Sequence, residues 1–231
     1  MIEIKSYSLD VTIEAYEECV FERFKELCGF FEGTEVDRDR LREAVLCFWE
    51  YLSLLQVRAV YSFFDANVFA DNNIYIDKRV FSEILKSNVF KIVFFAVSVD
   101  TGVSNVKNSF LGNILKEFYF DLTCNAVIDI SRKILKNIFE DFDFIKNSAF
   151  FVSRAFGPGF FGIGPEEISY FFKLIDCRKI GLYLNESGVI YPEKSFVGFF
   201  VVSENKIFIE NDCESCVGTK DGCFFCGKRG F

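Results

Sequence analysis

Histidine is absent from this chain of 231 residues, and proline occurs only three times. Without histidine there is no Cys–His or Ser–His nucleophile pair and no metal site with an imidazole ligand. Any chemistry must therefore use carboxylates, thiolates, Arg, Lys or Tyr, or proceed without proton transfer. Net positive charge is also lacking, since the formal net charge is -8. We therefore expect no nucleic-acid partner and no binding to anionic lipid through a basic surface.

Export signals and long hydrophobic runs are lacking as well. The first ten residues contain no basic segment followed by an apolar run. The longest apolar stretch, 89–99, includes Lys91 and is too short to cross a bilayer, so it indicates a buried strand. Nine cysteines are an odd number in a chain without a visible signal. This favours a cytoplasmic setting, with thiols or metal-bound thiolates in place of disulfides.

Apolar residues are abundant: half of the residues are apolar, and 32 of them are phenylalanines. Such a composition predicts a large core. Apolar residues at helical spacing predict four helices, and a fifth begins with Pro and two acids; their ranges are 12–31, 36–64, 77–87, 111–142 and 165–176. A dense β-branched and aromatic run predicts a central strand at 89–103, and 180–210 alternates as antiparallel strands do. We expect an α+β domain over 1–210, a twisted, mainly antiparallel sheet flanked by helices, followed by a cysteine-rich tail over 211–231.

The stretch SRAFGPGFFGIG, residues 153–164, differs from ordinary packing sequence. Gly157 and Gly159 permit backbone conformations or close approaches that a Cβ would block, and Pro158 stiffens the loop. Arg154 stands at the end of a predicted strand, where its planar fork can bind a carboxylate through two hydrogen bonds. With the phenylalanines as an apolar slot, the loop suits a small zwitterionic ligand that carries an aromatic base.

An ordinary surface turn is the alternative interpretation of this loop. Glycine and proline mark turns far more often than ligand loops, and Arg154 would then pair with Glu166 or Glu167. The stretch is not a P-loop, because the Lys-Ser/Thr pair is missing. It also lacks the strand–helix context of the dinucleotide-binding G-x-G-x-x-G motif.

Two spaced blocks of sequence resemble the reactivation domain of cobalamin-dependent methionine synthase. The first is RAFGPGF at 154–160, followed by a Pro-acid helix start; the family has Arg, a short spacer and Pro-Gly-Tyr there. The second block, NESGVIYPEKSFVGFF, supplies in the family's order Glu186, Ser187, Pro192, Ser195 and Gly198. Segments 56–64 and 94–102 resemble the family's helix end and its central strand with a Thr-Gly turn. Two departures are one extra residue between Arg154 and Pro158, and Phe160 in place of the motif's tyrosine.

The resemblance implies binding of S-adenosylmethionine. Arg154 would hold the methionine carboxylate, and the loop would pass close to the ligand, with backbone groups bonding the adenine; its residues are Ala155, Gly157, Pro158, Gly159 and Phe160. An acidic residue should meet the amino group. Asp129 is the candidate, because the family places an acid on the long helix, and Glu186 is its rival.

The resemblance also implies a reaction in which a reduced corrinoid attacks the sulfonium methyl group directly. That displacement needs orientation and proximity but no general base, so a chain without histidine can support it. No corrinoid-binding module is visible, and we expect a corrinoid-carrying protein or methyltransferase as the partner. Two alternatives remain: a binding or scaffold protein that kept the fold but lost the ligand, and a different S-adenosylmethionine enzyme with another acceptor.

The tail contains four cysteines in the pattern C-x2-C-x6-C-x2-C: Cys213, Cys216, Cys223 and Cys226. Four thiolates in two close pairs predict a metal site, of either zinc or an iron–sulfur cluster. Zinc would be structural, whereas a cluster could deliver one electron to an inactive cobalt. On functional grounds we favour the cluster.

Overall fold

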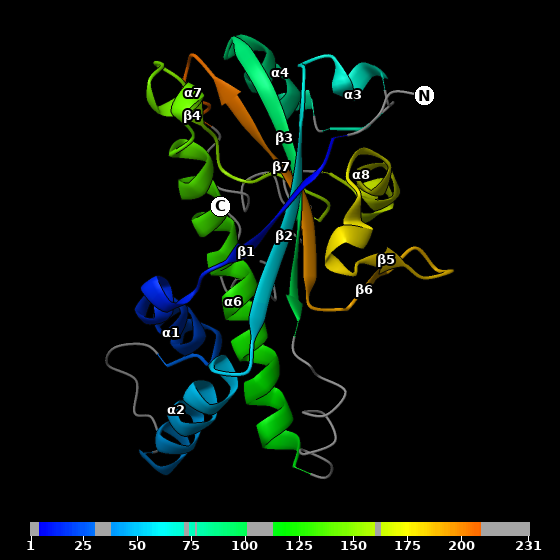
Figure 1. The fold of residues 1–231 in the computed structure, drawn as a ribbon. Coiled ribbons are helices and arrows are strands. Elements are labelled where there is room, and N and C mark those ends of the chain that lie inside the picture. Colours follow the sequence, from blue (N-terminus) through cyan, green and yellow to red (C-terminus); the bar gives the residue numbers. More distant parts are fainter. Residues whose placement is uncertain are drawn as a thin grey trace.

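A five-stranded antiparallel sheet forms the centre of the molecule. The computed structural model describes residues 5–30, 38–71, 74–76, 78–100, 113–159 and 163–208. The strand order in the sheet is β1-β2-β3-β7-β4, with bounds Tyr7–Val11, Gln56–Phe64, Val89–Asp100, Ser195–Ser203 and Phe151–Val152 in that order (Figure 1). Every pair of neighbours runs antiparallel. A separate hairpin consists of β5 (Tyr183–Leu184) and β6 (Ile190–Tyr191). This is the mixed α+β architecture that the sequence predicts.

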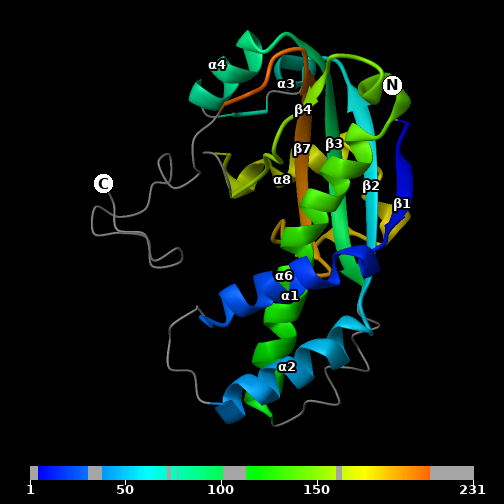
Figure 2. The same cartoon turned by 90° about the vertical axis from the view of Figure 1, so that its left-hand side faces the viewer.

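One face of the sheet is covered by the long helix α6 (Ile114–Glu140), which α1 (Glu17–Leu27) and α2 (Arg38–Leu52) cross (Figure 2). The short helices η1 (Glu14–Tyr16) and α7 (Asp143–Lys146) complete this side. Helix α6 begins where the Asn113 side chain accepts the backbone N–H of Lys116, a standard N-cap. Its apolar stripe, which includes Phe120, Val127 and Leu135, packs against the sheet in one large hydrophobic cluster.

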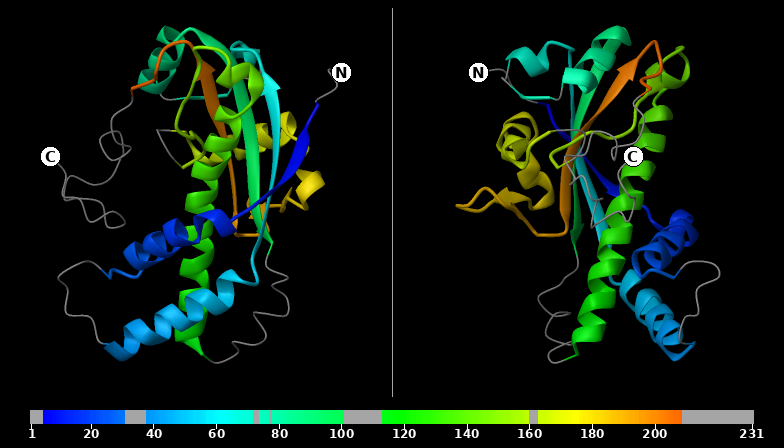
Figure 3. Two further views of the ribbon diagram at one scale, coloured as in Figure 1. Left: turned by 60° about the vertical axis from the view of Figure 1, so that its left-hand side comes forward. Right: turned by 180° about the vertical axis from the view of Figure 1, so that it is seen from behind.

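The opposite face carries shorter elements and a second hydrophobic cluster. They are α3 (Val68–Asp71), α4 (Lys78–Lys86), η2 (Pro165–Glu167), α8 (Ile168–Leu174), η3 (Cys177–Ile180) and the β5–β6 hairpin. The two views of Figure 3 show α8 and the hairpin on the side of the sheet away from α6. The Pro-acid start of the predicted helix at 165 is confirmed, because η2 leads directly into α8.

Strand β7 supplies side chains to both clusters. Phe200 and Val202 belong to the cluster on the α6 side, whereas Phe199 and Val201 belong to the cluster on the α8 side. Successive side chains of a strand point to opposite faces, so a strand buried on both faces is a continuous apolar run. This explains why 89–99 and 196–202 are so apolar in sequence.

The predicted helix over 36–64 is wrong in its second half. Helix α2 ends at Leu52, and Gln56–Phe64 form strand β2. This segment also resembled the family's helix end, and that assignment is wrong too. Residues 53–55 contain no Gly or Pro, so the sequence gives no stop signal there. The strand is specified by pairing along its whole length with β3 and along part of it with β1, which propensity does not reveal.

Two further predictions from the sequence are the domain boundary at residue 210 and the lack of a membrane-spanning segment. The four tail cysteines and the whole of 211–231 lie outside the described residues, so the domain boundary at 210 stays a prediction. Among the helices that the structure describes, none is long and apolar enough to cross a membrane.

Candidate functional site

The segment that carries Arg154 is held along the edge of β7. Backbone hydrogen bonds join Ser153 to the Val201 carbonyl at 2.9 Å and pair Phe156 with Phe199 at 2.9 and 2.8 Å. The Ser153 hydroxyl accepts the Val201 N–H at 2.9 Å and donates to the Arg154 carbonyl at 2.7 Å. These bonds fix the backbone of Arg154, and its side chain is exposed at the sheet edge.

Two glycines allow the loop to leave the sheet against β7. A Cβ on Gly157 would lie 2.6 Å from the Val197 carbonyl oxygen, and one on Gly198 would lie 2.5 Å from the Phe156 carbonyl oxygen. No real Cβ occupies such positions, so both residues must lack one. The sequence predicts a close approach at Gly157, and the structure shows that the backbone of β7 makes this approach. The contact joins the two sequence blocks that carry the family resemblance.

The loop then turns through Pro158 and Gly159. Gly159 has a φ of +85°, a left-handed conformation that favours glycine, and its N–H donates to the Ile163 carbonyl at 2.8 Å. Ala155 is half-buried against the α6-side cluster, and Pro158 is half-buried too. Phe160, which stands where the family motif has tyrosine, lies outside the described residues.

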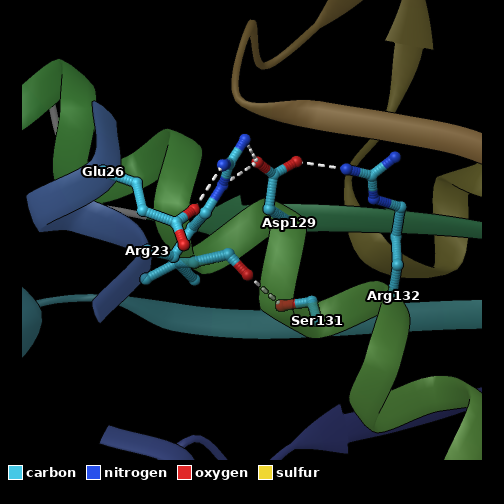
Figure 4. Close-up of polar contacts among 6 residues, drawn as sticks. Arg23, Glu26, Asp129, Ser131 and Arg132 are labelled. Atoms are coloured by element: carbon cyan, nitrogen blue, oxygen red, sulfur yellow. Dashed lines mark hydrogen bonds and ion pairs between the residues drawn. The ribbon is translucent and has the colours of Figure 1, made fainter. Parts of the chain in front are cut away.

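Asp129 lies on α6 between two arginines (Figure 4). Arg23 of α1 donates to its Oδ2 through Nε at 2.8 Å, with Nη2 also 2.8 Å from that oxygen. Arg132, one turn further along α6, donates to Oδ1. Arg23 is also paired with Glu26 at 2.7 Å. Burial works against the Arg23 charge, but the Glu26 and Asp129 carboxylates outweigh it and raise the pKa of Arg23.

Arg132 connects this ionic cluster to the glycine contact. Its guanidinium lies over the Phe196 ring, 5.0 Å from the ring centroid. The tip of that ring is 3.0 Å from the position a Gly157 Cβ would take. Asp129, Arg132, Phe196 and Gly157 thus form a continuous path from α6 across β7 to the loop. Sequence reasoning missed Arg23 and Arg132, although Asp129 and Arg132 stand three apart, a spacing that pairs side chains on a helix.

Glu186, the rival acid, is placed differently. It lies in the turn of the β5–β6 hairpin, where the Asn185 side chain accepts the N–H groups of Ser187 at 3.0 Å and Val189 at 2.9 Å. Glu186 is exposed. The hairpin projects on the α8 side of the sheet, whereas α6, the helix that contains Asp129, covers the other side (Figure 3). The structure therefore brings Asp129, but not Glu186, into the path that leads to the loop.

Glu167, one of the two acids offered as a surface partner for Arg154, has a structural contact. It is 7% exposed, and its Oε2 accepts the backbone N–H of Tyr75 at 3.2 Å. A buried carboxylate needs such a donor. Glu167 thus ties η2 to the segment 74–76.

Metal-ligating residues do not cluster within the part of the chain that the structure describes: no group of three or more acids or cysteines there could hold a metal ion. The four tail cysteines lie outside it. Of the remaining cysteines, Cys47, Cys124 and Cys177 are buried and Cys19 is exposed. Burial, with a smaller contribution from Asp176, raises the pKa of the Cys177 thiol to about 12.

Two hollows of the surface lie apart from the loop. One, of about 400 Å³, is lined by 10–14, Glu17, 52–53 and 55–57, where β1 meets the end of α2. The other, of about 480 Å³, lies between the end of α8, η3 and β5. None of the predicted ligand residues lines either hollow.

Comparison with known proteins gives the class of fold. No protein-family model matches the sequence, and no curated protein matches it. Among solved structures, the chain is similar to a crystal structure of the MetH reactivation domain bound to AdoHcy, with a TM-score of 0.54 and 12% sequence identity. The match covers 90% of this chain and 81% of that chain. At this identity the likeness shows the fold, and it confirms the architecture that the sequence motifs predicted.

Proposed function

We propose that this chain binds S-adenosylmethionine at the 153–159 loop and supports reductive activation of a corrinoid carried by a separate methyltransferase protein. The observation that carries the proposal is the fold, which is that of a domain solved with AdoHcy, the thioether left after methyl transfer. The two sequence blocks on which the resemblance rests come into contact where Gly157 passes Val197 and Gly198 of β7.

Three features of the structure support the proposed ligand contacts. Arg154 is exposed at the sheet edge on a backbone that Ser153 fixes, and a guanidinium is the side chain that best binds a carboxylate through two hydrogen bonds. The chain from Ala155 to Gly159 offers backbone groups close to the same edge. Asp129 is the better candidate than Glu186 for the ligand ammonium, because it is linked to the loop through Arg132 and Phe196.

The chemistry asks little of the side chains. S-adenosylmethionine supplies an activated methyl group when bound, and the corrinoid on the partner supplies the nucleophile. The chain would hold the ligand with its methyl group accessible at the sheet edge, a task of orientation and proximity. The absence of histidine is compatible with this, since no proton has to be moved.

The direct test is calorimetric titration of the purified protein with S-adenosylmethionine, alongside Arg154→Ala. We expect binding in the micromolar range that the variant loses by about tenfold or more, as for a lost charge-assisted hydrogen bond. Arg178→Ala is the matched control, because Arg178 is an exposed arginine on the α8 side. If neither the unmodified protein nor the two variants bind, only the similarity of fold would remain, and this would favour a scaffold protein.

A second assay separates an activation subunit from another S-adenosylmethionine enzyme. Methyl transfer is measured with a reduced corrinoid protein as the acceptor and a low-potential reductant supplied. Methylation of the corrinoid supports the proposal, whereas ligand binding without it points to a different acceptor.

We also propose that the tail cysteines, Cys213, Cys216, Cys223 and Cys226, bind one metal centre. The pattern supports this through its two C-x2-C pairs. Metal analysis and the visible spectrum of anaerobically purified protein test it. Iron with a broad brown absorption favours an iron–sulfur cluster that passes electrons to the corrinoid. Zinc in a colourless protein would make the tail structural, and protein free of both metals would contradict the proposal.

A further inference from the structure

The carboxylate of Asp129 already faces two cations of the protein itself. Arg23 approaches Oδ2 with two nitrogens, and Arg132 donates to Oδ1. Both oxygens face guanidinium groups, as Figure 4 shows. A ligand ammonium that pairs with this carboxylate therefore comes close to both guanidinium groups.

The two arginines approach Asp129 from different sides. Arg23 reaches it from a different helix through Nε and Nη2, and its Nη1 is tied to Glu26 at 2.7 Å. Arg132 donates to Oδ1 and lies over the Phe196 ring, whose tip is 3.0 Å from the position that a Gly157 Cβ would take. Arg132 is therefore the guanidinium between the carboxylate and the loop, and a ligand ammonium that arrives from the loop would meet it first.

Charge balance also favours an exchange over an addition. The cluster of Arg23, Arg132, Asp129 and Glu26 holds two cations and two anions. A third cation brought next to both guanidinium groups would meet repulsion in a partly buried site. If a ligand ammonium replaces the Arg132 guanidinium, the number of cations next to the Asp129 carboxylate does not change.

We propose that Arg132 is a built-in competitor for the ligand's α-ammonium group, so that binding requires its guanidinium to withdraw from Asp129. This inference rests on the proposed function and assigns Arg132 as a specificity-determining residue of the same site. The ion pair reduces the fraction of protein competent to bind, which weakens the apparent affinity in proportion. The affinity is reduced only for ligands whose ammonium group pairs with Asp129 in place of Arg132.

The test is calorimetric titration of Arg132→Gln with two ligands. One is S-adenosylhomocysteine, and the other is its analogue with hydrogen in place of the α-amino group. We expect Arg132→Gln to bind S-adenosylhomocysteine about fivefold more tightly than the unmodified protein, as for one ion pair of this exposure. The amine-free analogue should bind both proteins equally. Arg132→Lys keeps a cation beside Asp129 and should stay close to the unmodified protein.

Other outcomes have distinct meanings. Weaker or unchanged binding of S-adenosylhomocysteine by Arg132→Gln, with normal binding by the unmodified protein, overturns the competitor role alone. An equal change for both ligands also overturns it, since a structural effect would act on both. Absence of binding to every protein, while the thermal unfolding of each is cooperative, overturns the proposed function, and the inference with it.

Discussion

The two faces of the sheet are built from the same strands but differ in what surrounds them. On the α6 side, the margin of the hydrophobic cluster carries the Arg23–Asp129–Arg132 ion pairs, which lead through Phe196 to the loop. On the α8 side, aromatic rings such as Phe94 and Phe199 pack directly on one another, and Glu167 is the buried acid there. The α8 side thus consists mainly of packed apolar rings, whereas the α6 side also carries charged groups, among them the acid that we propose as the partner of the ligand ammonium.

The largest effect is expected from the α8 side. Phe199 is fully buried, with its ring centroid 4.9 Å from that of Phe69 and 5.3 Å from that of Phe156. Phe199→Ala should lower the free energy of unfolding by about 3–5 kcal/mol, because it leaves a cavity in the centre of the cluster. Urea denaturation measures this, with Phe118→Ala, half exposed on α6, as the control. Equal losses for both variants would contradict the packing described for this face.

Asp129 on the α6 side and Glu186 on the α8 side are the two candidate acids for the ligand ammonium. Asp129→Asn should weaken S-adenosylmethionine binding by about 10–100-fold, because a charged partner of the ammonium is lost. Glu186→Gln, in the exposed hairpin turn, should leave the affinity unchanged. Titration of both variants decides the matter, and the reverse pattern would move the ammonium site to the hairpin.

The third prediction concerns the glycine contact at the sheet edge. Gly198→Ala should lower the free energy of unfolding by about 1–3 kcal/mol, because its methyl group would meet the Phe156 carbonyl at 2.5 Å. The added group should also shift the loop and weaken ligand binding. Gly188→Ala is the control: its φ of +76° is strained for alanine, but nothing lies within 4 Å of the new methyl group. It should lose some stability and keep its ligand affinity.

The last prediction changes no residue and concerns the rates at which two thiols are labelled. Burial raises the pKa of Cys177 to about 12, so at pH 8 its thiol is almost entirely protonated and reacts slowly. Iodoacetamide should therefore label exposed Cys19 well before Cys177, as peptide mass spectrometry can follow. Labelling of Cys177 at the rate of Cys19 in native conditions would show that the α8 side opens readily.

Much of this arrangement could be predicted from the sequence. The periodic runs of α6 and β3 predict these two elements, and the Pro-acid helix start and the antiparallel strands near the end of the domain follow from sequence as well, because local pattern determines them. Strand β2 was not recognised, since pairing with two distant strands defines it. In the candidate site, the close approach at Gly157 could be predicted from residue type and is confirmed, whereas the ligand contact of Arg154 stays a prediction. The Asp129–Arg23 pair joins residues 106 apart in sequence, so only the folded chain reveals it.

The contact between Gly157 and β7 also bears on the order in which the site can form. Every backbone bond described here between the Arg154 segment and the sheet is made to β7, which follows it by some forty residues. During synthesis the loop would leave the ribosome before the strand that positions it. Arg154 could reach its final position only after β7 had joined β3, so ligand binding should be among the last properties that a growing chain acquires.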